Sequence, residues 1–600
     1  MPKYTPPVRD TRFVLDHVVA IDRYANLPGF QNATPDVVTA VLEEGGKFVA
    51  EVLFPINLSG DQEGCTRHPD GSVTTPAGFK EAYRAFVESG WSTLAAPEEF
   101  GGQAMPHVVS TAFEEYMISA NMAFAMYPGL THGAIAALLV KGSAEQKAKY
   151  VPKMVSGEWG GTMNLTEPQC GTDLGLIKTK AEPQADGSYA ITGTKIFISS
   201  GEHDLTDNII HLVLAKTPGA PDSTKGISLF VVPKFLVNDD GSLGARNTLS
   251  CGSIEHKMGI HGNSTCVMNY DGATGWLVGE EMKGLAAMFI MMNAARLGVG
   301  LQGLGVAETA YQNAVQYAHD RRQGRALTGA AEPGEKADTL FVHPDVRRML
   351  MEAKALTEGL RALCLWGALQ VDLAHMAPTE DERQLADDLI GLLTPVIKGY
   401  GTDMGYAIAT NAQQVYGGHG YIAEWGMEQY VRDARIAMIY EGTNGVQAMD
   451  LVGRKLATNG GRAVQALFRI AGEEIAAAKG NAQLADFATR LERALGDLQA
   501  ATGWFVQNGF ANPNNVGAGA HSYMHIMGIV AVGLMWLRMA TAAAALREAG
   551  EGDAAFLDAK LVTARFYAER VLPDTGALRH KIEGGAEAVM ALAPEMFEAA

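Results

Sequence analysis

A stretch rich in glycine, threonine and short β-type runs interrupts a chain that is otherwise helical in pattern. Within it, the runs Ser188–Ser199, Ile209–Ala215 and Gly226–Val232 combine β-branched and aromatic residues, which favours strands. On either side, apolar residues recur at helical spacing, as in Asp36–Phe54, where Pro35 marks the expected helix start. Because strands and helices are segregated along the chain, the pattern predicts an α+β fold rather than alternating βα units.

The changes in pattern divide the 600 residues into five predicted segments. Glycine-rich breaks such as Asn459-Gly460-Gly461 suggest the boundaries, and loops are expected at Gly329–Lys336 and Asn508–Gly519. The segments are a leader (1–35), a helical N-terminal domain (36–160), an antiparallel β domain (161–282), a second helical domain (283–460) and a helical C-terminal extension (461–600).

Charge and cysteine content exclude several classes of protein. The formal net charge of -19 disfavours a nucleic-acid partner and binding to an anionic membrane surface. Five scattered cysteines without metal-ligand spacing indicate reduced thiols and a cytoplasmic location. The first residues contain prolines and charges where an export signal needs an apolar run. The strongest apolar run, Ile526–Leu537, is too short to span a bilayer and predicts a buried helix.

Two segments around the β domain contain residues suited to binding a planar ring. Asn164–Gly175 (NLTEPQCGTDLG) offers hydroxyls and backbone N–H groups, although by composition it is also an ordinary turn. Lys195–Gly201 (KIFISSG) places Phe197 and Ser199 two residues apart, so both lie on one face of a strand. Phe197 could stack on a ring while Ser199 donates a hydrogen bond; the alternative is a core Phe beside a surface Ser.

A third segment, Gln414–Asn444, combines glycines with an isolated carboxylate. Gly417 and Gly418 permit close backbone approach to a phosphate. Glu441 follows an uncharged apolar stretch, and a carboxylate in such surroundings has a raised pKa and can act as a base. The alternative interpretation is a Glu near a helix end.

In this order, the three segments resemble the acyl-CoA dehydrogenase family over about residues 35–460. The resemblance implies a helical N-terminal domain, a middle β-barrel, a four-helix bundle, FAD as cofactor and Glu441 as the base. Some members of the family carry the base just before an Arg on an earlier helix. Here Ala295 precedes Arg296 and cannot act as a base, which leaves Glu441.

The resemblance also implies the other residues of the site. Phe197 and Ser199 stand where Trp and Thr are usual, the segment around Arg321 lacks the usual Phe, and Gly445 replaces a Gln. The implied FAD contacts are Thr166, Gly171, Thr172, Phe197, Ser199, Arg321, Gln414, Gly417, Gly418, Thr443 and Asn444. The implied substrate contacts are Thr172, Arg296, Tyr440 and Gly442, and no metal is expected.

The implied reaction is α,β-desaturation of an acyl-CoA thioester, with electrons passed to an electron-transfer flavoprotein. The leader and the extension resemble a long branch of the family that includes dehydrogenases of 3-(methylthio)propanoyl-CoA in dimethylsulfoniopropionate degradation, which would yield 3-(methylthio)acryloyl-CoA. The alternatives are a fatty acyl-CoA dehydrogenase of β-oxidation and an acyl-CoA oxidase. Met288–Met292 could contact a thioether, or could be the core face of a helix.

The C-terminal extension raises two further questions, one about DNA and one about assembly. Some relatives with an extension are DNA-associated alkylation-response flavoproteins. Residues 461–600 carry 12 Lys and Arg against 15 Asp and Glu, which is not the basic surface that DNA binding needs.

In the family the FAD site includes residues of a neighbouring subunit, so a homo-oligomer is expected, and the extension favours a dimer.

Overall fold

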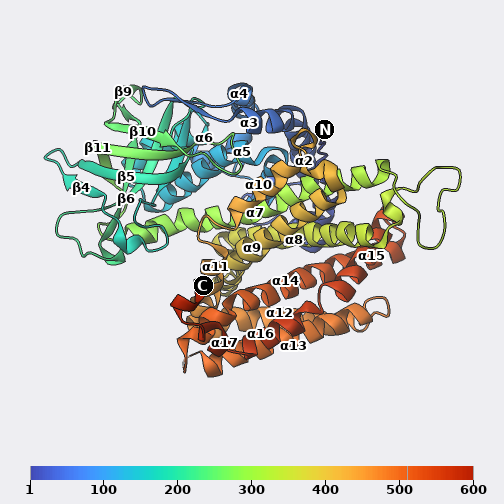
Figure 1. The fold of residues 1–600 in the computed structure, drawn as a ribbon. Helices are drawn as coiled ribbons and strands as arrows, with labels where there is room; N and C mark the ends of the chain where they lie inside the picture. The colour runs from blue at the N-terminus through green and yellow to red at the C-terminus, as the bar shows by residue number, and fades with distance from the viewer. Residues whose placement is uncertain (1, 510, 599–600) are drawn as a thin grey trace. The chain divides into compact units, whose positions relative to one another are not determined.

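The computed structural model describes residues 2–509 and 511–598 (Figure 1). Two compact units can be distinguished. One unit, called the helical unit below, comprises the residues up to Glu43, Pro106–Glu115 and the chain from Val299 onward. The other, called the barrel unit, comprises Glu44–Met105 and Tyr116–Gly298. Helices dominate the first, and the strands lie in the second, so the predicted α+β class is confirmed.

The main sheet of the barrel unit contains the three predicted strands and four others. Its strands are β3 (Trp159–Asn164), β4 (Lys180–Pro183), β5 (Tyr189–Ser199), β6 (Asn208–Lys216), β7 (Ile227–Pro233), β10 (Leu249–Ile254) and β11 (Thr265–Leu277). Pairing runs from β11 through β5, β4 and β6 to β7 and returns to β11, which closes a ring. Two short hairpins lie outside it: β1 (Thr66–Arg67) with β2 (Val73–Thr74), and β8 (Phe235–Val237) with β9 (Leu243–Arg246).

The strand directions differ in part from the antiparallel domain that was predicted. β3 runs parallel to β6 over six residue pairs, from Trp159↔Asn208 to Asn164↔Val213. β4 also meets β6 in parallel, at Lys180↔Lys216. β3 and β6 can pair in parallel because the β4–β5 hairpin lies between them in the chain. No hairpin signal in the sequence predicts such a non-local pair.

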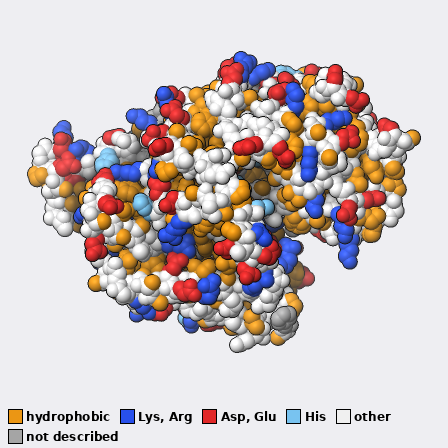
Figure 2. Space-filling model, turned by 180° about the vertical axis from the view of Figure 1, so that it is seen from behind, with side chains coloured by type: hydrophobic (Ala, Val, Ile, Leu, Met, Phe, Trp, Pro, Cys, Tyr) orange, Lys and Arg blue, Asp and Glu red, His pale blue; other side chains and the backbone are white. Residues whose placement is uncertain are grey.

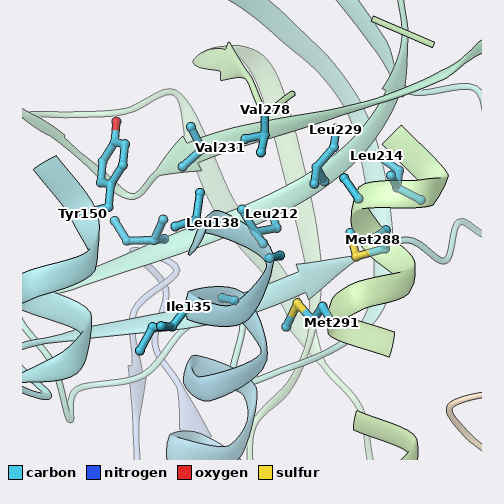
Figure 3. Close-up of a cluster of buried hydrophobic side chains, with 14 of the residues drawn as sticks. Ile135, Leu138, Tyr150, Leu212, Leu214, Leu229, Val231, Val278, Met288 and Met291 are labelled. Atoms are coloured by element: carbon cyan, nitrogen blue, oxygen red, sulfur yellow. The ribbon is translucent and has the colours of Figure 1, made fainter. Parts of the chain in front are cut away.

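The strands β6 and β7 of the barrel are buried on both faces. Along β6, Leu212 and Leu214 contact one apolar cluster, whereas Val213 belongs to another. The alternation follows the two-residue period of a strand. The first cluster joins the outer strand face to residues of helices α5, α6 and α7, and Figure 3 shows Met288 and Met291 among its side chains. Met288–Met292 therefore forms the core face of a helix, the second of the two interpretations above.

Among the described residues, six α-helices precede the main sheet, and the start of one of them, α2, matches the sequence prediction. They are α1 (Val8–Phe13), α2 (Pro35–Phe48), α3 (Asn57–Glu63), α4 (Phe79–Glu88), α5 (His107–Lys141) and α6 (Ala144–Val155). α2 starts at Pro35, as expected, and gives way after Phe48 to a π-helical turn. α6 begins at a capping box in which Ser143 and Gln146 exchange hydrogen bonds.

After the sheet the described residues form helices joined by loops. The elements are α7 (Gly284–Asp320), α8 (Pro344–Met376), α9 (Glu380–Val415), α10 (Met427–Ala437), α11 (Asn444–Asp450), α12 (Arg462–Ala478), α13 (Ala485–Asn508), α14 (Pro513–Ala549), α15 (Ala554–Arg570), α16 (Asp574–Glu583) and α17 (Glu587–Met590). Within the helical unit, α14 packs against α8 and α9 as well as α13, α15 and α16 (Figure 1). The extension therefore shares a core with the helices before it.

The loop predicted at Asn508–Gly519 is shorter than expected. α14 begins at Pro513, and the Asn512 side chain accepts a hydrogen bond from the Asn514 backbone N–H. Asn at the N-cap followed by Pro at the first helical position is a helix-start signal. One glycine of this stretch, Gly519, instead allows close packing, because a Cβ there would lie 2.8 Å from the Phe505 ring.

Within residues 2–509 and 511–598, three helices are long and apolar enough to cross a membrane, judged by length and composition. They are α5, α7 and α14. The predicted apolar run Ile526–Leu537 lies inside α14, which has 37 residues, so the helix is not too short to span a bilayer, contrary to the expectation. The run itself is buried within the helical unit, as predicted.

A buried network of charges joins the leader and the extension to the helices of the same unit. The Arg361 guanidinium donates to Asp10, to Glu308 and, at 2.7 Å, to Glu115. Lys560 of α15 also contacts Asp10. Removing one member would leave an uncompensated buried charge, which is strongly destabilising. The leader and the extension are therefore built into the helical unit.

Candidate active site

The Asn164–Gly175 segment is a compact loop in the barrel unit. Glu167 and Cys170 form a two-way backbone bridge, with N···O distances of 2.9 and 3.0 Å. The Ile196 N–H of β5 donates to the Thr166 carbonyl at 2.9 Å. The loop presents Gly171 and Thr172 to solvent, while Thr166 is half-buried. The structure thus brings the first two predicted segments side by side within one unit.

A buried ion pair between Glu167 and Lys195 holds the two segments together. The Lys195 ammonium donates to a Glu167 carboxylate oxygen at 2.8 Å and to the Leu165 carbonyl at 3.0 Å. The same carboxylate accepts from the Thr179 hydroxyl and the backbone N–H groups of Lys178 and Thr179. Burial alone would raise the pKa of Glu167, but Lys195 and these donors lower it to about 2.

Phe197 lies at a β-bulge and adopts a left-handed backbone conformation, with φ of 59°. Lys195 pairs with Met268, and Ile198 pairs with Cys266, so β5 has one more residue here than β11. The bulge leaves Lys195 and Ile198 buried and Phe197 59% exposed. Ser199 is half-buried. A large aromatic side chain held outward by a strained bulge offers a ring face to a ligand.

In the helical unit, Glu441 occupies the turn between α10 and α11. Its φ is 57°, and Gly442 follows with a φ of 80°, so two successive residues are left-handed. A non-glycine residue rarely adopts this conformation, and its strain persists only where the surroundings enforce it. The turn is closed by the Asn444 N–H, which donates to the Met438 carbonyl at 3.1 Å. Glu441 itself is half-buried.

Two buried side chains, Lys398 and Gln447, hold this turn from within the unit. The Lys398 ammonium of α9 donates to the Gly442 carbonyl and to the Asn444 amide oxygen, each at 2.8 Å. The Gln447 amide donates to the carbonyls of Glu441 and Gly442, each at 3.1 Å. These bonds account for the strained backbone of the turn, because they occupy both carbonyl groups at its apex.

Thr443 and Asn444 have structural partners at the start of α11. The Thr443 hydroxyl accepts a hydrogen bond from the Val446 N–H and caps the helix. The Asn444 amide nitrogen donates to the Gly399 carbonyl and to an Asp403 carboxylate oxygen. Both residues therefore shape the Glu441 turn, whatever contacts they make with a cofactor.

The glycine-rich segment at Gly417 and Gly418 forms an open tip after α9. Gly417 has a φ of 57°, and a Cβ added at either glycine would meet nothing within 4 Å. An aromatic cluster supports the tip: the Tyr317 and Tyr416 rings stack at 4.0 Å, and the Tyr317 hydroxyl bonds His419 at 2.9 Å. The exposed backbone can therefore approach a large ligand closely.

Arg321 follows the last residue of α7, near this tip. The ring of Tyr317, one turn earlier on α7, stacks on Tyr416 at the end of α9. The helix ends that carry Arg321 and Gln414 are therefore neighbours in the helical unit, and both side chains are exposed. The two predicted FAD contacts lie on one edge of that unit.

The two other predicted substrate contacts are Tyr440, which directly precedes Glu441 in the turn, and Arg296. The Tyr440 hydroxyl hydrogen-bonds the Gln302 side chain of α7 within the helical unit. Burial raises the pKa of Tyr440 well above its usual range, as does the nearby Glu441 carboxylate. Arg296 also lies on α7, in its barrel-unit part, and is buried.

Sequence reasoning missed the two lysines that hold the loops. Lys195 and Lys398 are both fully buried. Each is a single charge within an apolar run, KIFI for Lys195 and PVIKGYG for Lys398. A lone lysine in such a run is a usable signal, because lysine is almost never fully buried unless its charge is partnered.

Models of known protein families match nearly the whole chain. "Acyl-CoA dehydrogenase, N-terminal domain" matches residues 47–158, the middle domain 162–273 and the C-terminal domain 282–456. "Acetyl-CoA dehydrogenase C-terminal like" matches residues 469–593. This chain belongs to the acyl-CoA dehydrogenase family. The enzyme is therefore an oxidoreductase that acts on acyl-CoA, and FAD is its cofactor.

Relatives of the dehydrogenase match it along its full length. The 3-methylmercaptopropionyl-CoA dehydrogenase of Ruegeria pomeroyi is 45% identical over 96% of this chain and 98% of its own. A broad-specificity linear acyl-CoA dehydrogenase of Mycobacterium tuberculosis is 36% identical over 97% and 98%. The fold matches that of an acyl-CoA dehydrogenase complexed with FAD from Bacillus anthracis, with a TM-score of 0.74, 21% identity and coverage of 94% and 90%.

The residues present in this dehydrogenase fit FAD. The exposed ring of Phe197 can stack on a flavin, and half-buried Ser199 offers it a hydroxyl donor. The open backbone at Gly417 and Gly418 and the exposed Arg321 suit a pyrophosphate. Each set lies in its own unit, and the individual contacts remain predictions.

Proposed function

We propose that this acyl-CoA dehydrogenase oxidises 3-(methylthio)propanoyl-CoA to 3-(methylthio)acryloyl-CoA in dimethylsulfoniopropionate degradation. The observation that carries the proposal is the 45% identity to a 3-methylmercaptopropionyl-CoA dehydrogenase over nearly all of both chains, leader and extension included. A linear acyl-CoA is the second candidate, because relatives named for linear acyl-CoA and butyryl-CoA are each 36% identical over similar lengths.

Glu441 is the base in this proposal. Its carboxylate accepts the α proton of the thioester while the β hydrogen leaves with its electron pair, and the Cα=Cβ double bond forms. Bound FAD supplies the acceptor for that hydride. The Glu441 backbone N–H stabilises the negative charge that develops on the thioester oxygen. Lys398 and Gln447 support this role because they hold the carbonyl groups of Glu441 and Gly442 in the turn.

The remaining contacts are assigned from the family resemblance and the exposure of each residue. In the barrel unit, Thr166, Gly171 and Thr172 join Phe197 and Ser199 in binding FAD, and Thr172 also contacts the acyl-CoA. In the helical unit, Arg321, Gln414, Gly417 and Gly418 contact FAD, together with Thr443 and Asn444. Tyr440, Gly442 and Arg296 contact the substrate. Alanine variants of exposed Arg321 and Thr172 test these assignments by FAD content and by KM respectively.

The enzyme works as a homodimer in the cytoplasm in this proposal. Exposed Arg321 and Gln414 at one edge of the helical unit support a role toward the FAD of a neighbouring subunit. The five cysteines are free thiols, in keeping with a reducing compartment. The face drawn in Figure 2 intersperses Lys and Arg with Asp and Glu, and residues 461–600 carry more acidic than basic side chains, which disfavours a DNA partner. A mass by light scattering twice that of the chain is expected; a monomer with full FAD content would contradict the dimer.

A panel of acyl-CoA substrates tests the proposed reaction. It pairs 3-(methylthio)propanoyl-CoA with pentanoyl-CoA, in which a methylene replaces the sulfur, and adds butanoyl-CoA and octanoyl-CoA. A sulfur contact contributes about 0.3–1.5 kcal/mol, so kcat/KM should favour the thioether over its isostere by up to about tenfold. Equal or better rates with pentanoyl-CoA would instead support the linear acyl-CoA candidate.

The electron acceptor is tested in the same assay. With electron-transfer flavoprotein present, turnover should reduce that protein and yield little hydrogen peroxide. Stoichiometric peroxide without reduction of the flavoprotein would identify an acyl-CoA oxidase instead.

A further inference from the structure

One aspartate and two histidines of the helical unit converge outside the site described above. His521 and His525 are one turn apart on α14, and Asp403 lies on α9. The Nε2 atom of His525 is 2.8 Å from Asp403 Oδ2, and that of His521 is 3.4 Å from the same oxygen. One ligand atom from each residue lies within 4.8 Å of the others.

This arrangement matches the needs of a transition-metal ion. Two histidines at positions i and i+4 share one face of a helix, as in helical zinc sites. Ligand atoms about 2.1 Å from a tetrahedral Zn²⁺ are about 3.4 Å from each other. The distance from His521 to Asp403 Oδ2 already has this value, and the 2.8 Å from His525 would have to lengthen by about 0.6 Å to admit the ion. We propose that Asp403, His521 and His525 bind a divalent transition-metal ion such as Zn²⁺, with the fourth position open to water.

Neighbouring groups orient two of the three ligands. The Asn444 amide nitrogen donates to Asp403 Oδ1 at 2.7 Å, which leaves Oδ2 for the histidines or a metal. The His525 and Tyr400 rings pack perpendicular to each other, with their centroids 5.3 Å apart. Outer partners of this kind fix ligand geometry in metal sites. The positive charge of Lys581 on α16 acts on His521 and therefore opposes the binding of a cation there.

Metal binding here would join the extension to the base-bearing turn. The ion would link α14 to α9 through Asp403, and Asn444 connects Asp403 to the turn that carries Glu441. The three ligands and Asn444 all belong to the helical unit. The inference stands on these contacts alone and does not depend on the proposed substrate.

The test uses untagged, FAD-loaded enzyme that has been treated with a chelator and then desalted. Binding of Zn²⁺ is measured by calorimetry, and binding of Co²⁺ is measured by visible absorption. Wild type should bind one equivalent and give the absorption of Co²⁺ bound to nitrogen and oxygen ligands. His521→Ala and His525→Ala should each weaken binding at least tenfold. The matched control is His580→Ala, since exposed His580 also lies beside a carboxylate, 3.6 Å from Glu583, and should leave binding unchanged.

Folding does not confound this test. His521 is 60% exposed, so its alanine variant should retain the wild-type circular dichroism and melting temperature without metal. Added Zn²⁺ should raise the melting temperature of wild type and of His580→Ala, but not of His521→Ala. Binding that is absent in wild type, or equal in all variants, would overturn the proposal and leave Asp403 as a hydrogen-bond acceptor for two histidines.

Discussion

The loop around Glu167 in the barrel unit and the turn around Glu441 in the helical unit are held in place by different interactions. Phe197, beside the Glu167 loop, and Glu441, within its own turn, are both non-glycine residues in the left-handed conformation. A fully buried lysine holds each of the two segments. Lys195 meets a carboxylate, whereas Lys398 donates to the neutral oxygens of Gly442 and Asn444. The first loop therefore depends on charge pairing, and the second on hydrogen bonds to the backbone.

The largest expected effect follows from removing the charge at Lys195. Lys195→Met leaves the Glu167 carboxylate buried without its counter-ion, which should lower the free energy of opening this loop by about 3–5 kcal/mol. Hydrogen exchange of peptides covering Asn164–Ser199 measures this. The double variant with Glu167→Gln should lose less than the sum of the two single changes. Unchanged exchange in Lys195→Met would show that the ion pair does not hold the loop.

Acid should weaken the same loop. The pKa of Glu167 is about 2 in the folded enzyme, against an ordinary value of 4.5. Because the folded pKa is the lower one, the stabilisation is complete above pH 4.5 and is lost as the pH falls toward 2. Exchange corrected for its intrinsic pH dependence should show this loss in wild type. Lys195→Met should show much less of it; an identical pH profile would contradict the assignment to this pair.

Replacing the other lysine should affect stability less and catalysis more. Lys398→Met removes one donor from the Gly442 carbonyl, which keeps its bond from Gln447, and one from the Asn444 amide oxygen. This should lower the free energy of opening the Glu441 turn by about 1–3 kcal/mol. The released turn should also lower kcat, because the base is no longer held in place. Exchange of peptides around residues 438–450 and steady-state kinetics measure the two effects. A kcat equal to that of wild type would show that the turn needs no such support.

The smallest expected effect concerns the cap of α11. Thr443→Ala removes the hydroxyl that accepts from the Val446 N–H, at a cost of about 1 kcal/mol in local stability. Exchange at the start of α11 should rise modestly, while the Glu167 loop should be unchanged. A loss as large as that of Lys398→Met would mean that the cap, rather than the lysine, holds the turn.

Much of this architecture could be predicted from the sequence because it rests on local patterns. Runs of β-branched and aromatic residues between turn-forming segments predict β5, β6 and β7, and Pro35 predicts the start of α2. The bulge at Phe197 could not be predicted from the sequence. The extra residue of β5 is defined only by its pairing with β11. The loop predicted over Asn508–Gly519 includes Asn512-Pro513, although these two residues are the start signal of α14.

The candidate residues show the same limit. The sequence pattern pointed to Glu441 and Phe197, but not to the left-handed conformations that both adopt. It does not predict that Lys195 pairs with Glu167. The two residues are 28 positions apart in the sequence, and their salt bridge depends on how the strand and the loop fold together. Non-local contacts of this kind are set by tertiary packing rather than by local propensity.

The role of Glu441 is tested most directly by anaerobic mixing of FAD-loaded Glu441→Gln with 3-(methylthio)propanoyl-CoA and, separately, with butanoyl-CoA. The variant should retain FAD, yet bleaching of the flavin absorbance should slow by about 1,000-fold or more with both substrates. Glu548→Gln, which changes an exposed glutamate of α14, should bleach at the wild-type rate. Bleaching of Glu441→Gln at near the wild-type rate would contradict the assignment of Glu441 as the base.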